Sequence, residues 1–231
     1  MKRRKPISQD YMLPIEPLTD NQKVMFDAWD EGKMIYAYGV AGTGKTFVAL
    51  YKALKEVLDD YSPYEKIYIV RSLVATREIG FLPGDHEDKS SLYQIPYKNM
   101  VQAMFEMPDD NSYEMLYDNL KAQETISFWS TSFIRGTTLD NSIVIIDECQ
   151  NLNFHELDSI ITRVGQDSKI IFCGDAAQTD LQKISERTGI IDFQRILQNM
   201  EEFSMIEFGI EDIVRSGLVK SYLINKINLG L

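Results

Sequence analysis

Short runs of apolar residues recur along the chain with the length and composition of buried β-strands. They are rich in Ile, Val and aromatic residues and show little alternation with polar ones. Strands covered on both faces of a parallel sheet have this pattern. The runs therefore predict a mostly parallel sheet. Its strands are expected at residues 34–38, 66–70, 125–129, 143–146, 169–173 and 205–208.

Segments with helical periodicity lie between these strands. Phe47, Leu50 and Leu54 repeat at helical spacing after the first strand, and another helix is expected to begin near Thr19. Because strands and helices alternate, the pattern predicts an α/β fold with helices on both faces of the sheet.

An inserted pair of helices is expected near residues 90–122. A Met-rich apolar stripe marks the first of them, and such a stripe belongs more often to a core than to a binding surface. The stripe consists of Tyr97, Met100, Val101, Met104 and Phe105.

The first predicted strand runs into a phosphate-binding loop. The sequence matches G-x-x-x-x-G-K-[ST] at every fixed position and lies between a strand and a helix, as this motif requires. Its glycines let backbone N–H groups surround phosphate oxygens, and the following helix directs its positive end at them. Lys45 is expected to contact the β- and γ-phosphates of ATP, and Thr46 the Mg²⁺ ion. The loop comprises Gly39, Val40, Ala41, Gly42, Thr43, Gly44, Lys45 and Thr46.

Two carboxylates follow the most apolar strand. Asp147 and Glu148 come directly after residues 143–146, at the sheet edge where parallel strands deliver catalytic groups. Asp147 is expected to help hold Mg²⁺, and Glu148 to polarise the attacking water. The alternative is a pair of acids at a helix N-terminus, where negative charge is also favoured.

Gln22 has two interpretations of similar weight. In the first, it completes a capping box: Thr19 caps the helix while the Gln22 side chain reaches back to the backbone of Thr19. In the second, it recognises the adenine base, as a Gln placed before the phosphate loop does in many helicases.

Further polar residues follow the later strands. Asp175 and Gln178 lie just after residues 169–173, where an acid and an amide can contact the γ-phosphate and its water. Arg215 follows the last predicted strand and is expected to stabilise the transferred phosphoryl group, although a surface position is the commoner use of arginine.

Composition limits the class of protein. The 231 residues suit one α/β domain over 18–231, preceded by a Pro-containing extended arm over 1–17 that lies on or off the domain. No apolar run approaches the roughly 18 residues needed to cross a bilayer. Cys149 and Cys173 are expected to be buried thiols, which fits a reducing cytoplasm.

The net charge of −11 argues against a surface that is generally attractive to nucleic acid, so such a partner needs a local groove. Cations and stacking rings after the second and third strands are typical of a weak site for single-stranded nucleic acid. The alternative is that the aromatic residues are core and the arginines form ion pairs. The candidates are Arg71, Arg77, Phe81, Trp129 and Arg135.

Several motifs together resemble the PhoH family of phosphate-loop ATPases. Beyond the phosphate loop, the resemblance rests on residues 80–85, 135–139, 147–151, 174–181 and 214–215, and it covers residues 18–223. It implies a RecA-like P-loop NTPase fold similar to the first motor domain of superfamily 1 helicases, ATP and Mg²⁺ as cofactors, and helicase-like or RNA-directed activity. Ser72 and Cys149 depart from the usual Pro and Ala, but neither change removes a catalytic group. Compact members are common in bacteriophages, which fits a viral protein in a host cytoplasm.

The resulting hypothesis is an ATPase that remodels RNA or single-stranded DNA. The alternative is an ATP-controlled switch or chaperone-like ATPase acting on a protein partner; a small-molecule kinase is less well supported. Because the chain has residues for one motor domain only, Arg215 is expected to reach the ATP of a neighbouring subunit. This predicts a homo-oligomer, with a hexamer as the expected form. The competing interpretation is a monomer with Arg215 on its surface or acting within its own chain.

Overall fold

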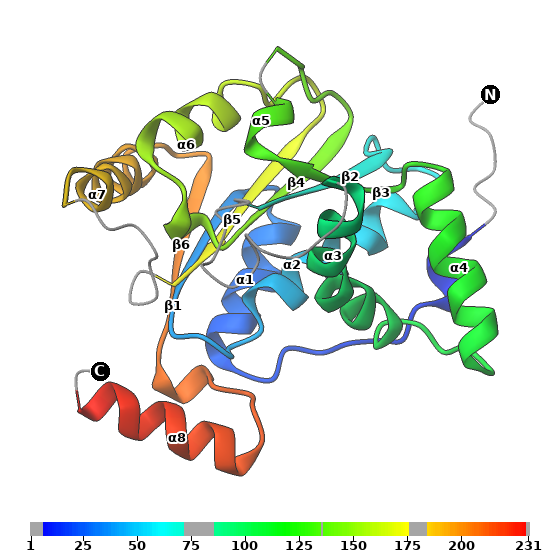
Figure 1. Cartoon of the computed structure of the whole chain (residues 1–231), viewed down its shortest axis with the longest axis horizontal. Coiled ribbons are helices and arrows are strands. Elements are labelled where there is room, and N and C mark those ends of the chain that lie inside the picture. The colour runs from blue at the N-terminus through cyan, green and yellow to red at the C-terminus, as the bar shows by residue number, and fades with distance from the viewer. Residues whose placement is uncertain (1–6, 72–85, 135, 176–183, 230–231) are drawn as a thin grey trace.

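The apolar runs form one six-stranded sheet in the computed structural model, which describes residues 7–71, 86–134, 136–175 and 184–229 (Figure 1). The strand order is β3-β2-β4-β5-β1-β6, and every pair is parallel. All the strand predictions are confirmed. The strands are β1 (Met34–Gly39), β2 (Lys66–Arg71), β3 (Ile126–Ser130), β4 (Ser142–Asp147), β5 (Lys169–Gly174) and β6 (Phe203–Phe208).

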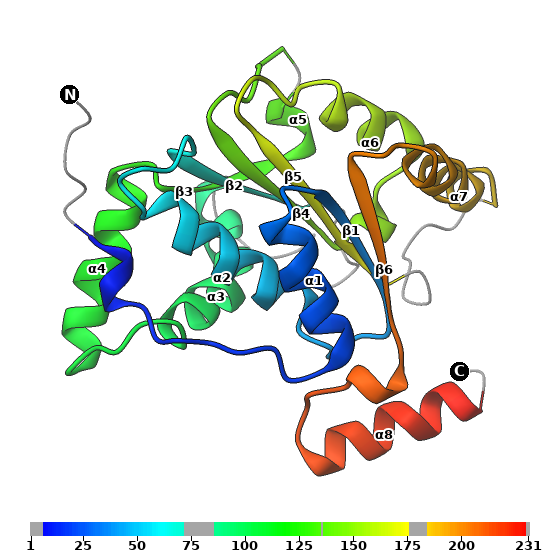
Figure 2. The same ribbon diagram turned by 180° about the vertical axis from the view of Figure 1, so that it is seen from behind.

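Helices cover both faces of the sheet, as predicted (Figures 1 and 2). The first four α-helices in the sequence lie on one face of the sheet, and the next three lie on the other. On the first face are α1 (Asp20–Asp30), α2 (Lys45–Val57), α3 (His86–Gln102) and α4 (Asp110–Ala122). On the second are α5 (Thr131–Ile134), α6 (Phe154–Ile161) and α7 (Ile184–Gln198).

Alternation along the strands divides the core into two layers. In β1, Ile35 and Ala37 pack under α1 and α2, whereas Tyr36 between them packs against Phe172 and the helices of the opposite face. Successive side chains of a strand point to opposite faces. A run that is apolar at every position is therefore buried on both sides.

The inserted helices α3 and α4 anchor the N-terminal arm. A bridge joins Met12 to Phe105, and the backbone N–H of Leu13 donates to the carbonyl of Met104 at 2.8 Å. The N–H of Ile15 donates to the hydroxyl of Tyr51 in α2 at 3.1 Å. The described part of the arm thus lies on the domain, across α2 and the insertion (Figure 2).

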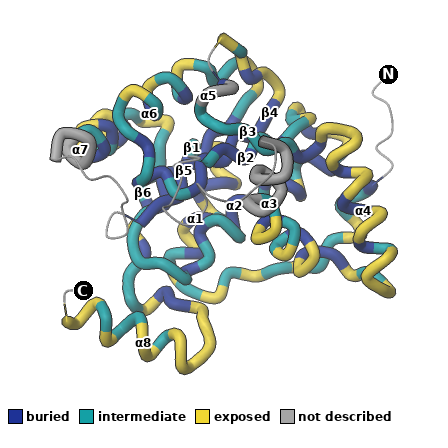
Figure 3. Tube along the Cα trace, viewed as in Figure 1, coloured by how far each residue is buried: buried dark blue, intermediate teal, exposed yellow. Residues whose placement is uncertain are grey.

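The C-terminal helix α8 (Gly217–Asn228) stands apart from the layered body (Figures 1 and 3). None of its residues is buried. Leu218 and Tyr222 of this helix and Leu229 directly after it expose 84%, 65% and 72% of their surface. Across the described ranges, no helix combines the length and apolar character that a membrane crossing needs.

Candidate nucleotide site

The phosphate loop joins the end of β1 to the start of α2. Gly39, Gly42 and Gly44 have φ angles of 113°, 77° and 83°, which L-residues with a side chain rarely adopt. Gly44 directly precedes α2, so the positive end of that helix faces the loop. The backbone has the form that the motif predicts.

Lys45 is folded back into this loop and is 8% exposed. Its Nζ donates to the carbonyl oxygens of Gly39 and Val40 at 3.1 and 2.7 Å, and to Oγ1 of Thr43 at 3.1 Å. Burial lowers the pKa of Lys45, and nearby acidic groups such as Asp175 offset this only in part. The loop is therefore arranged around one ammonium group.

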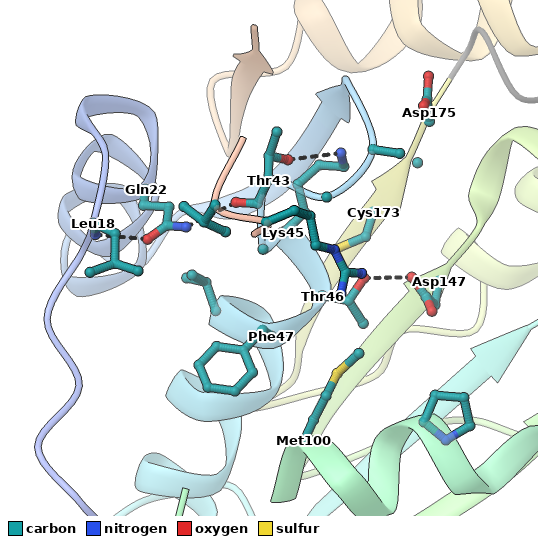
Figure 4. Close-up of a pocket in the computed structure, with 18 of the residues that line it drawn as sticks. Leu18, Gln22, Thr43, Lys45, Thr46, Phe47, Met100, Asp147, Cys173 and Asp175 are labelled. Carbon is teal, nitrogen blue, oxygen red and sulfur yellow. Dashed lines mark hydrogen bonds between the residues drawn. The ribbon is translucent and has the colours of Figure 1, made fainter. Parts of the chain in front are cut away.

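Thr46 at the start of α2 and Asp147 at the carboxyl end of β4 are joined by a hydrogen bond. Oγ1 of Thr46 donates to Oδ1 of Asp147 at 2.7 Å (Figure 4). Asp147 is 8% exposed. A hydroxyl and a carboxylate are hard oxygen ligands, and Mg²⁺ at phosphate sites commonly takes one or two carboxylates together with phosphates and waters. The donor set therefore fits Mg²⁺. No group of three or more His, Cys, Asp or Glu side chains forms a metal cage among the described residues.

Glu148 follows with a left-handed backbone, at φ 52°. It stands at the N-cap of the 3₁₀ helix Cys149–Asn151, but its side chain makes no capping hydrogen bond. Glu148 thus has the helix-terminal position of the alternative interpretation, without the hydrogen bond of a cap. Its carboxylate instead accepts a hydrogen bond from Nε2 of Gln150.

Gln150 links two acidic residues, a role that the sequence did not reveal. It is 2% exposed, and its Oε1 accepts from the backbone N–H of Asp175 at 3.0 Å while its Nε2 donates to Glu148. Asp175 lines the same cavity as the phosphate loop (Figure 4). Gln178 lies outside the described residues.

The two cysteines are free and buried, as expected. Cys173 lines the cavity floor. Burial raises the pKa of Cys149 to about 12, so this thiol stays neutral. A Cβ at Gly174 would lie 2.6 Å from Sγ of Cys149 and 2.9 Å from Oε1 of Gln150, so the close packing of β5 on the acidic segment requires glycine.

Tyr97 of α3 also contacts Asp147. Its hydroxyl donates to Oδ2 of Asp147 at 2.6 Å, and the side chain is 2% exposed. Burial, followed by the charge of Asp147, raises the pKa of Tyr97, which therefore remains a donor. With Met100, it lines the cavity. The interpretation of the Met-rich stripe as core alone is thus incomplete, because part of it forms a wall of the site.

Gln22 connects the start of α1 to the phosphate loop. Its Oε1 accepts from the backbone N–H of Leu18 at 2.9 Å, and its Nε2 donates to the carbonyl of Thr43 at 2.9 Å. Thr19 caps the helix through the N–H of Gln22, but the reciprocal bond of a capping box is replaced by the bond to Leu18. The capping-box interpretation is therefore only half right.

These groups enclose a cavity of about 520 Å³. Figure 4 shows Leu18 and Gln22 on one side of the phosphate loop and Asp147 and Asp175 on the other. The side with Leu18 and Gln22 is largely apolar, and the side with Asp147 and Asp175 is acidic. The two sides therefore suit an apolar part and a charged part of a ligand. The apolar side is lined by Ile15, Leu18, Phe26, Phe47 and Met100.

Arg215 lies at the phosphate loop of its own chain. The N–H of Val214 donates to the carbonyl of Gly42 at 3.1 Å, and a Cβ at Gly42 would lie 2.9 Å from Cγ of Arg215. Arg215 lines the cavity. Arg215 therefore borders the phosphate loop of its own chain, as the interpretation of an arginine acting within its own chain expects, and donation to a neighbouring subunit stays a prediction.

The proposed nucleic-acid residues fall into three groups. Arg71 lines the nucleotide cavity beside Tyr97 and Asp147. Trp129 packs on Tyr68 with ring centroids 4.6 Å apart and is partly buried against the second core layer. Arg77, Phe81 and Arg135 lie outside the described residues.

Comparison with known proteins finds PhoH-like proteins among the relatives of this chain. The PhoH-like protein of Mycobacterium leprae is 32% identical over 206 residues, which cover 89% of this chain and 56% of that protein. The PhoH-like protein of Bacillus subtilis is 32% identical over 210 residues, covering 87% and 60%. The chain thus spans little more than half the length of the curated relatives it matches.

Solved structures share the architecture at low sequence identity. The large terminase of a thermophilic bacteriophage, in complex with ADP, has a TM-score of 0.50 and 14% identity, with 89% of this chain and 49% of the terminase covered. The parallel sheet and loop give the chain a RecA-like P-loop NTPase fold. A family model described as PhoH-like protein matches residues 14–225. The chain belongs to the PhoH family.

Proposed function

We propose that this chain is a Mg²⁺-dependent ATPase that couples ATP hydrolysis to remodelling of RNA or single-stranded DNA. One observation carries the proposal. The hydroxyl of Thr46 and the carboxylate of Asp147 lie 2.7 Å apart, in the cavity that also contains Lys45. A phosphate-binding lysine beside hard oxygen ligands suits a metal–nucleoside triphosphate.

Each polar group has a role in this reaction. The backbone N–H groups of the loop and the ammonium of Lys45 bind the β- and γ-phosphates, exchanging the loop carbonyls for phosphate oxygens. Glu148 accepts a proton from the attacking water, and Arg215 offsets charge that develops on the transferred phosphoryl group. Bound Mg²⁺, held by Thr46 and Asp147, would neutralise phosphate charge. Gln150 keeps Glu148 and Asp175 at fixed positions.

The adenine end of ATP suits the apolar side of the cavity. Gln22 borders that side, with both ends of its amide on backbone groups. Base recognition by Gln22 remains our proposal, and it requires one of these bonds to exchange. The ADP complex of the bacteriophage terminase supports a nucleotide ligand.

Nucleic acid is proposed as the partner whose remodelling is driven by ATP hydrolysis. Arg71 ends β2 at the cavity, and Arg77 and Phe81 follow it in the sequence, so a bound strand here would be close to the nucleotide. Trp129 contributes less than expected, because Tyr68 covers part of its ring. The acidic chain should hold such a strand weakly and in a salt-dependent manner.

Two variants test the chemistry. Lys45→Ala should abolish ATP binding or turnover, because it removes the charge that meets the phosphates. Glu148→Gln should bind Mg·ATP normally and lose hydrolysis by about 100-fold or more. Near wild-type turnover by Glu148→Gln would mean that another group activates the water.

Oligonucleotide stimulation tests the partner. Single-stranded RNA or DNA should raise the ATPase rate severalfold at low salt, and the effect should fall with added salt. No stimulation under any of these conditions would contradict the nucleic-acid assignment.

The exposed apolar residues of α8 favour a second candidate. Leu218 and Tyr222, with Leu229 directly after the helix, form a surface typical of protein contacts. Such a helix beside the nucleotide site suits an ATP-controlled switch that acts on a protein partner, and it also supports the predicted homo-oligomer. This candidate predicts an ATPase rate that nucleic acid leaves unchanged.

Two free thiols are consistent with a cytoplasmic location.

A further inference from the structure

Tyr97 holds the oxygen of Asp147 that Thr46 does not use. Oδ1 of Asp147 accepts from Thr46 at 2.7 Å, and Oδ2 accepts from the hydroxyl of Tyr97 at 2.6 Å. Two donors from different elements thus fix both the position and the rotation of one carboxylate. The three side chains connect α2, β4 and α3 in a continuous hydrogen-bonded chain.

Packing alone does not account for this hydroxyl. The Tyr97 ring contacts Phe128 with centroids 5.4 Å apart, and a phenylalanine at position 97 could make the same contact. The hydroxyl adds a hydrogen bond to a carboxylate, which is stronger than one between neutral groups. Because Asp147 is itself buried, this bond also determines where its negative charge lies.

We infer that Tyr97 is a positioning residue for the metal-binding carboxylate and couples the α3–α4 insertion to the nucleotide site. This inference rests on the proposed function. Thr46 and Asp147 would hold Mg²⁺ when Mg·ATP is bound, and the bond from Tyr97 to Oδ2 would keep the Asp147 carboxylate in place. Since partners of ligating groups commonly change metal affinity by about 10-fold or more, loss of this hydroxyl should weaken Mg²⁺-dependent binding.

The coupling also works in the reverse direction. If Mg·ATP binds best when Tyr97 contacts Asp147, occupancy of the site must favour the same position of α3. The insertion packs on α2 and contacts the N-terminal arm through Met104 and Phe105. A ligand that displaces α3 should therefore change metal-dependent nucleotide affinity without touching the phosphate loop.

Tyr97→Phe is the direct test, with Tyr113→Phe as its matched control. Tyr113 is a buried tyrosine of the same insertion, and its hydroxyl donates to the carbonyl of Lys98, away from the cavity. Binding of a fluorescent, non-hydrolysable ATP analogue is titrated with Mg²⁺. We expect Tyr97→Phe to raise the half-saturating Mg²⁺ concentration about 10-fold, and binding in EDTA to stay at the wild-type level.

Tyr113→Phe should leave both quantities unchanged. Equal Mg²⁺ responses of the two variants would overturn the inference. A double-mutant cycle gives a second measurement: in an Asp147→Asn background, Tyr97→Phe should have little further effect on Mg²⁺ dependence. Additive effects would also overturn it. Wild-type protein that binds no nucleotide at any Mg²⁺ concentration would instead contradict the proposed function itself.

Discussion

Gly39 ends β1 and begins the phosphate loop, where backbone geometry leaves no room for a side chain. Its φ is 113°, and a Cβ there would lie 2.9 Å from the backbone nitrogen of Phe208 and closer still to its carbonyl oxygen. That oxygen also accepts from the N–H of Val40 at 2.9 Å. A substitution must therefore disturb the pairing of β1 with β6.

Gly39→Ala should lower the free energy of unfolding by about 3 kcal/mol or more, since left-handed strain and backbone displacement add. Gly32→Ala is the matched control, because Gly32 has a φ of 80° but no atom within 4 Å of the added Cβ. It should lose only about 1–2 kcal/mol from strain. Denaturant unfolding compares them, and equal losses would mean that the contact with Phe208 is readily relieved.

The sequence predicted the chemical identity of the site better than its contacts. Lys45, Thr46 and Asp147 could be predicted because a motif specifies both residue type and local backbone. Tyr97 could not, since its position on an apolar stripe resembles core and its partner lies 50 residues away in sequence. The contacts of Gln22 could not be predicted either, because its second partner is the carbonyl of Thr43, which only the tertiary fold brings near.

At the scale of elements, the strands were predictable and their order was not. Each strand is an apolar run because it is buried on both faces, which is a local property. Neighbours in the sheet depend on packing between distant segments, and β1 lies between β5 and β6. The position of Arg215 follows from that order, because β6 leads the chain past the phosphate loop.

Asp212 fastens this last segment to α1. Its Oδ2 accepts from Nδ2 of Asn21 at 2.7 Å and from the N–H of Gly209 at 2.9 Å. Burial alone would raise the pKa of Asp212, but hydrogen bonds from Thr19, Asn21 and Gly209 lower it overall. A carboxylate with a lowered folded-state pKa stabilises the protein above its unfolded pKa, and this contribution is lost as pH falls through the folded value.

Asp212→Asn should therefore lower the free energy of unfolding at pH 7 by about 1–3 kcal/mol. The difference from wild type should shrink below about pH 4, where the unfolded-state carboxyl becomes protonated. Asp30→Asn is the control, because Asp30 pairs with Lys52 through a side chain that is 66% exposed and should contribute little. A difference that stays constant with pH would show that the charge of Asp212 is not what stabilises this junction.

At the scale of the whole molecule, each proposed ATP site is either completed by one chain or shared between two subunits. Arg215 lies over Gly42 of its own phosphate loop, so we expect it to act on ATP bound by the same subunit. Lys45→Ala and Arg215→Ala subunits, each inactive alone, should then stay inactive when mixed. Restored hydrolysis in the mixture would demonstrate donation between subunits. Light scattering on the same samples gives the number of subunits and tests the predicted hexamer independently.

The place of β1 in the sheet also affects how the protein is made. Its hydrogen-bonded neighbours are β5 and β6, at residues 169–174 and 203–208, whereas β1 itself occupies 34–39. During synthesis, β1 leaves the ribosome before β5 and β6, so it has no strand to pair with until they have followed. Pairing between such distant segments is slow, and unpaired apolar strands are prone to aggregate. The nascent chain must therefore keep this apolar strand from aggregating throughout the interval in which it cannot yet bind a nucleotide.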